Sequence, residues 1–119
     1  MNDGDLIELL LENYTEQYNI YKFLLDNINA GIPTGDTPPD VSKIIKILEE
    51  RRKSFDRIKE IDDGIKPYKI DWEKRKNEVD SVLAETLKTL LKNIKEILSK
   101  VMEANERLEE IMNKALRKA

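Results

Sequence analysis

Histidine and cysteine are both absent from this sequence. Without cysteine the chain can form neither a disulfide nor a thiolate metal site. Without histidine it lacks the commonest metal ligand and the side chain whose ordinary pKa is closest to neutral pH. An enzyme built from this chain would have to use glutamate or lysine alone as its catalytic base. We therefore predict no enzyme, no catalytic residues, no cofactor and no metal site.

Long apolar runs and an excess of one charge are also missing. A membrane-spanning helix needs about 20 mostly apolar residues, but charges interrupt every apolar stretch here. Charged residues make up 38% of the chain while the net charge is only −3, so the two signs are interspersed rather than gathered into a nucleic-acid-binding face. Residues 1–5 are acidic where a signal peptide is basic. We expect a cytoplasmic protein that neither binds nucleic acid nor inserts into membranes.

The charge is uneven in one segment, residues 1–30. This segment carries a single cation, Lys22, and six acids: Asp3, Asp5, Glu8, Glu12, Glu16 and Asp26. Such an imbalance suits either a basic partner or a basic neighbour within the fold.

Glycine and proline are few and clustered, and they divide the chain. Apart from Gly4, all of them lie within residues 31–39 or 64–67. These breaks predict three helices, at about 5–30, 40–63 and 71–117, within one domain covering 1–119. Gly31 is expected to end the first helix in the left-handed conformation. Beyond residue 71 there is no further glycine or proline, so the third helix has no signal to stop.

Local signals place the helix ends and one interruption. Asp5, with Glu8 three residues later, resembles a capping box for the first helix. Thr37 or Asp40 can cap the second helix. The apolar stripe of the second helix is interrupted at Arg51 or Arg52, so that side chain is expected to extend towards water or to meet an acid.

The third helix carries a regular heptad seam typical of a coiled coil. Its apolar positions alternate spacings of four and three: Leu83, Leu87, Leu90, Ile94, Ile97, Val101, Ala104, Leu108, Ile111 and Ala115. At 1.5 Å per residue the third helix would be about 70 Å long, whereas the first two would reach roughly 37 and 33 Å. The sequence therefore predicts an all-α, antiparallel three-helix bundle with a long C-terminal helix, part of whose seam is left uncovered.

An uncovered apolar seam indicates an interaction partner. We hypothesise that an amphipathic helix of another protein binds there. The expected partner-binding residues are Leu90, Ile94, Ile97, Leu98, Val101, Met102, Asn105, Leu108, Ile111 and Met112. Two alternatives remain: the helix bends near Asn93 or Asn105 into a fourth segment that buries the seam, or two copies cover each other as a homodimer.

Two segments resemble a known family. Residues 47–62, ILEERRKSFDRIKEID, resemble the middle helix of the FlgN/FliT-type flagellar export chaperones, in which leucines and an arginine precede spaced apolar residues and an acid. Residues 97–108, ILSKVMEANERL, are similar to the family's last helix, in which an asparagine follows an apolar repeat. The proline-rich loop and the single Asn105, where the family often has two nearby asparagines, depart from the pattern.

The resemblance implies a cytoplasmic chaperone of a type III secretion pathway. Such a protein binds the amphipathic C-terminal helix of a hook-associated or filament-cap subunit and prevents its premature assembly. The residues themselves leave two other functions open: a self-associating helical structural protein, and an adaptor for another secretion or signalling complex.

Overall fold

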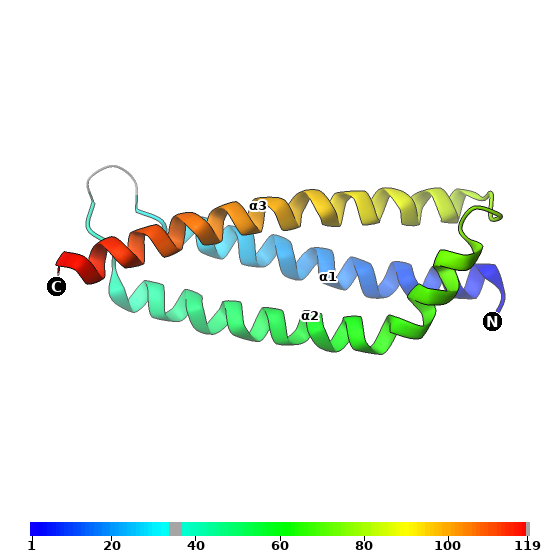
Figure 1. Cartoon of the computed structure of the whole chain (residues 1–119), viewed down its shortest axis with the longest axis horizontal. Coiled ribbons are helices and arrows are strands. Elements are labelled where there is room, and N and C mark those ends of the chain that lie inside the picture. The colour runs from blue at the N-terminus through cyan, green and yellow to red at the C-terminus, as the bar shows by residue number, and fades with distance from the viewer. Residues whose placement is uncertain (34–36, 119) are drawn as a thin grey trace.

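The structure is a computed structural model that describes residues 1–33 and 37–118. Its helices are α1 (Asp3–Gly31), α2 (Val41–Arg75) and α3 (Val82–Lys118). Successive helices run in opposite directions (Figure 1), so the fold is the predicted all-α, antiparallel three-helix bundle with a long C-terminal helix. α3 continues without interruption for 37 residues, and the bend considered near Asn93 or Asn105 does not occur.

Side-chain caps begin the first two helices. The Asn2 side chain accepts a hydrogen bond from the Asp5 backbone N–H at 2.8 Å, so the expectation that Asp5 caps α1 is wrong. Asp40 caps α2, as one of the two predictions had it, by accepting from the Lys43 N–H at 3.3 Å. Residues 34–36 of the predicted loop lie outside the described residues.

The end of α2 differs most from prediction. The helix was expected to stop at residue 63 but continues through Gly64 and Pro67 to Arg75. Pro67 has no backbone N–H, so the carbonyl of residue 63 loses its helical hydrogen bond. Residue 63 is exposed, so water can take the place of the missing donor. Burial of Ile65 and Trp72, which are 3% exposed each, offsets this cost because a buried aliphatic or aromatic side chain contributes about 1.5–3 kcal/mol.

α3 consequently starts later than expected, at residue 82 rather than 71. The reversal occurs over residues 76–81, which contain neither glycine nor proline. Ser81 ends it by accepting a hydrogen bond from the Ala84 N–H at 3.1 Å. A serine thus provides the end of the turn, since its short polar side chain bonds to nearby backbone.

Gly31 is the last residue of α1, as predicted, but it does not adopt the predicted conformation. Its backbone is not in the left-handed region, but a Cβ atom at this position would overlap the Cδ1 of Ile47 on α2. A side chain at position 31 would therefore have to displace the end of the buried Ile47 side chain. Gly64, by contrast, has open space around it.

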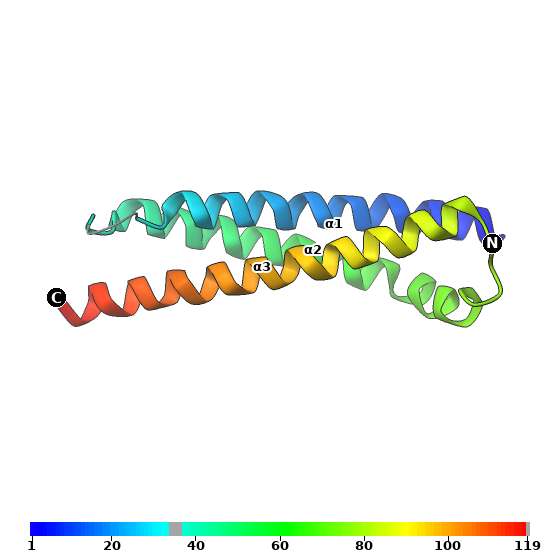
Figure 2. The ribbon, with the colours of Figure 1, turned by 90° about the horizontal axis from the view of Figure 1, so that it is seen from above.

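α1 is the shared neighbour of the other two helices. It packs against both α2 and α3, whereas within the described residues no Cα of α2 lies within 8 Å of a Cα of α3. Figure 1 shows α1 between α3 and α2, and Figure 2 shows α3 crossing in front of the pair formed by α1 and α2. The bundle is elongated, 58 Å along its longest axis.

A polar contact separates two apolar cores. One core surrounds Trp72 near the start of α1, and the other surrounds Leu24 and Leu108 towards its end. Between them lies Gln17, which is 3% exposed and donates a hydrogen bond to Asp62 Oδ1 at 2.7 Å. A polar contact of this kind, made by a buried amide, favours one register between helices, because a shifted register loses the Asp62 acceptor.

Tyr14 lies beside this polar contact and is 7% exposed. Burial, and then the charges of Asp62 and Glu73, raises its pKa to about 12. Burial and Asp62 also raise the pKa of Tyr21. The protein environment thus favours the neutral phenols over the phenolates.

Two glycine substitutions should shift stability in opposite directions. Gly64→Ala removes a flexible residue from a helix interior without a clash, and we expect it to stabilise the protein by about 0.5–1 kcal/mol. Gly31→Ala should destabilise it by about 1 kcal/mol or more, because Ile47 must leave its packed position. Urea unfolding followed by circular dichroism measures both; shifts of the same sign would contradict this account of Gly31.

Tyr14 should make stability fall at alkaline pH. Its pKa rises from 10.0 to about 12 on folding, so the unfolded chain ionises first. The stabilisation is complete below pH 10 and is lost as the pH rises towards 12, up to about 2–3 kcal/mol. Tyr14→Phe should behave like the wild type at pH 7 but lose less stability at alkaline pH. Lysine deprotonation affects both proteins equally, so a constant difference across pH would contradict the prediction.

Candidate functional site

Three of the predicted partner-binding residues lie in the core of the chain itself. Ile97 is 8% exposed, and Val101 and Leu108 are 0% exposed. They pack in the core formed with Leu24 and Ile47. The expectation that this part of the seam is uncovered is therefore wrong, because α1 and the start of α2 reach far enough to cover it.

The other seven predicted residues are divided among different surroundings. Ile94 packs against both cores, and Ile111 packs against the core around Leu24. Leu90 is partly buried and lines a hollow between α1 and α3. The remaining four lie on or beside the side of α3 that faces α2, and two of them, Leu98 and Met112, also pack against the core around Leu24. The four are Leu98, Met102, Asn105 and Met112.

Arg51 links α2 to α3 and identifies their facing sides. Its Nη1 donates to Asn105 Oδ1 at 3.2 Å and to Glu109 Oε1 at 3.5 Å. The interrupting arginine thus meets an acid, as one of the two expectations required. This ion pair is largely exposed on the glutamate side, so it contributes at most about 1 kcal/mol.

Apolar residues continue from Arg51 along the same side of α2. Leu48 lies three residues before Arg51 and Phe55 four residues after it, and both spacings keep side chains on one helix face. Phe55 is 38% exposed. Ile45, three residues before Leu48, is exposed at the outer edge.

Matching apolar residues lie on α3. Met102 is three residues before Asn105 and is 58% exposed, while Leu98 and Met112 lie seven residues to either side of Asn105 and are half-buried. Because α2 and α3 are antiparallel and Arg51 meets Asn105, Phe55 lies level with Met102. We call this surface the α2–α3 face; it consists of Ile45, Leu48, Phe55, Leu98, Met102 and Met112.

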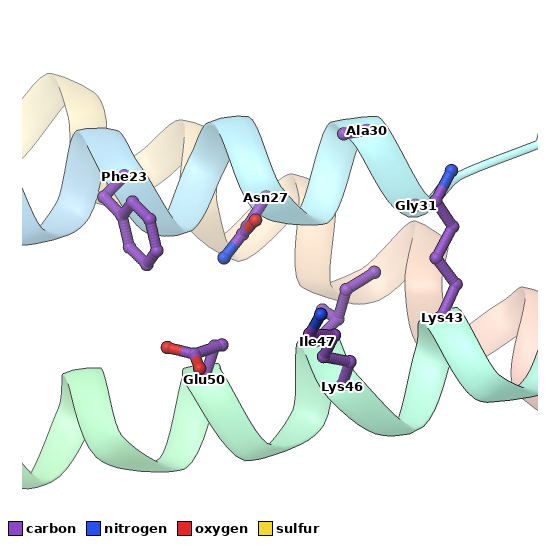
Figure 3. Close-up of a pocket in the computed structure, with 8 residues that line it drawn as sticks. All are labelled: Phe23, Asn27, Ala30, Gly31, Lys43, Lys46, Ile47 and Glu50. Carbon is purple, nitrogen blue, oxygen red and sulfur yellow. The ribbon is translucent and has the colours of Figure 1, made fainter.

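A second exposed phenylalanine lies on a different flank. Phe23, 52% exposed, borders a hollow of about 420 Å³ between α1 and α2. Figure 3 shows Phe23 and Asn27 of α1 opposite Lys46 and Glu50 of α2. Lys43, Lys46 and Glu50 also line this hollow, so charged groups stand opposite Phe23 on this flank.

The acidic α1 finds basic neighbours within the fold at two positions. Glu16 pairs with Arg57 at 2.8 Å and Asp3 with Arg75 at 2.9 Å. Both arginines donate hydrogen bonds to these carboxylates, and this raises the pKa of both guanidinium groups further. The described residues contain no group of three acids placed to hold a metal ion.

Comparison with known proteins adds no relatives. No protein-family model matches the chain, and neither the curated proteins nor the solved structures contain a significant match. None of the described helices is both long and apolar enough to cross a membrane.

The contribution of α2 to this surface was missed by sequence reasoning. The predicted partner-binding residues all lie on the third helix, so Phe55 of the second helix was not among them. A signal was present, because Leu48 and Phe55 lie seven residues apart on the far side of Arg51 from the buried Ile47 and Ser54. Periodicity alone could not show that α3 lies too far away to cover them.

Two neighbouring residues on α3 should differ greatly in how much stability the same substitution costs. Val101→Asp buries a carboxylate in an apolar core and should destabilise the protein by at least about 3 kcal/mol. Met102→Asp places it on an exposed surface and should change stability by no more than about 0.5 kcal/mol. Urea unfolding monitored by the buried Trp72 measures both. Equal losses would show that Met102 belongs to the core.

Proposed function

We propose that this protein binds an amphipathic helix of another protein on the α2–α3 face and thereby keeps that helix from assembling prematurely. The observation that carries the proposal is the exposure of Phe55 and Met102 at the same level of two helices that stand apart. Large apolar side chains gathered on a surface favour association, since burying them removes apolar area from water.

A helix laid between α2 and α3 would complete a four-helix arrangement. Its apolar stripe would contact both helices, with residues at spacings of three and four meeting Phe55 on one side and Met102 on the other. Methionine side chains adapt to different partners because they are unbranched and polarisable, and this face has two, Met102 and Met112. Binding of this kind needs no catalytic step.

The resemblance of residues 47–62 and 97–108 to FlgN/FliT-type chaperones supports a particular cargo. Both segments contribute to the α2–α3 face, through Leu48 and Phe55 in the first and Leu98 and Met102 in the second. We therefore propose the C-terminal helix of a hook-associated or filament-cap subunit as the cargo, bound in the cytoplasm before export.

Binding should depend on the α2–α3 face and not on exposed aromatic residues in general. We expect a labelled peptide from the C-terminal helix of such a subunit to bind the wild type in a one-to-one complex, measured by fluorescence anisotropy and light scattering. The double variant Phe55→Glu/Met102→Glu should weaken binding at least about 100-fold, as expected when two central contacts are lost. Phe23→Glu is the matched control, because Phe23 is more exposed but lies on the other flank.

Other outcomes would favour different functions. Equal loss of binding in the Phe23→Glu control would exclude the α2–α3 face as the specific site. A stable dimer of the wild type that ignores every peptide, and becomes monomeric in the double variant, would instead support the self-associating structural protein.

A further inference from the structure

Arg51 spans the gap between α2 and α3. Its Nη1 donates to Asn105 Oδ1 at 3.2 Å and to Glu109 Oε1 at 3.5 Å, although in the described residues no Cα of α2 lies within 8 Å of a Cα of α3. Within the same part of the chain, these two are the only hydrogen bonds between the two helices. We call Arg51, Asn105 and Glu109 the Arg51 bridge.

The Arg51 bridge crosses the α2–α3 face near its middle. On one side of it, Phe55 lies level with Met102. On the other side, Ile45 comes six residues before Arg51 on α2 and therefore lies level with Met112 of the antiparallel α3. At 1.5 Å per residue the two apolar pairs are about 15 Å apart along α2. The polar bridge therefore separates the apolar residues at one end of the face from those at the other.

A helix that contacts both apolar pairs has to pass over the Arg51 bridge. The Arg51 side chain is 24% exposed and that of Glu109 is 58% exposed, so both charges are in contact with water in the free protein. A helix packed over them would remove this water, and the loss of hydration of an ion pair can exceed the attraction between its charges. Opening the bridge costs less, because the ion pair is exposed and its hydrogen bonds, at 3.2 and 3.5 Å, are long.

We propose that the Arg51 bridge closes the middle of the α2–α3 face in the free protein and must open before a helix binds along the face. This inference rests on the proposed function and adds a contact that regulates the same site. Once Arg51 releases Asn105 and Glu109, its long side chain can extend its charged end to water, and the apolar contact becomes continuous along the face. Only a helix whose apolar contact outweighs the cost of opening binds, so the bridge selects against weakly apolar helices.

Breaking the bridge from either end should strengthen binding. Arg51→Met keeps an apolar stem but has no donor, whereas Asn105→Ala/Glu109→Ala removes both acceptors, and the two changes shift the net charge in opposite directions. The probes are the cargo peptide and a synthetic leucine-heptad peptide of zero net charge, with affinities measured by fluorescence anisotropy. We expect each variant to bind both peptides about three- to tenfold more tightly than the wild type, because opening the bridge costs an exposed ion pair and one hydrogen bond. Combining the variants should add little, since both break the same contact.

Arg57→Met is the matched control, because Arg57 also links two helices, by its contact with Glu16 of α1 at 2.8 Å, but lies on the flank of α2 that carries the hollow beside Phe23. It should leave both affinities unchanged. A gain in only one of the two bridge variants, an equal gain in Arg57→Met, or no gain at all would overturn this inference while leaving the proposed function intact. Failure of the wild type and of every variant to bind either peptide would overturn the proposed function, and the inference with it.

Discussion

The packing of α2 and α3 onto one shared helix is the constraint on which the rest of this structure depends. α1 contributes buried residues along its whole length, from Leu6 to Ile28, and both other helices bury their apolar sides against it. Because each of them satisfies its packing on α1, they need not approach one another closely. The spacing between α2 and α3, and hence the surface that presents Phe55 and Met102, follows from this division of contacts.

Sequence patterns predicted the helix content and the fold class but misplaced one reversal of the chain. The heptad seam of α3 was recognisable because its apolar spacing continues without a miss, and its central positions are buried as such a seam requires. Gly64 and Pro67 are conventional stop signals, yet α2 continues through them. Local propensity cannot report the burial of Ile65 and Trp72 on α1, which outweighs the cost of one glycine and one proline in the helix.

The candidate site was predicted only in part, for a geometric reason. Leu98, Met102, Asn105 and Met112 were predicted together with Ile97, Val101 and Leu108, although the structure separates them into a half-open side and a core. A helix with a broad apolar stripe can pack against two neighbouring helices at once. Which side stays open depends on the distance between helices, and that distance is not encoded in apolar periodicity.

The contact between Gln17 and Asp62 has a consequence beyond the two cores that it separates. Leu48, Phe55, Asp62 and Lys69 occupy equivalent places in successive heptads of α2, so sliding this helix by two turns would put a phenylalanine or a lysine where Gln17 now finds its acceptor. The single buried amide of Gln17 therefore fixes the register of α2, and so it determines which stretch of α2 stands opposite Met102. A mutation at Gln17, far along the bundle from Met112, would thus change the side chains that stand opposite Met102 without altering any residue of the α2–α3 face.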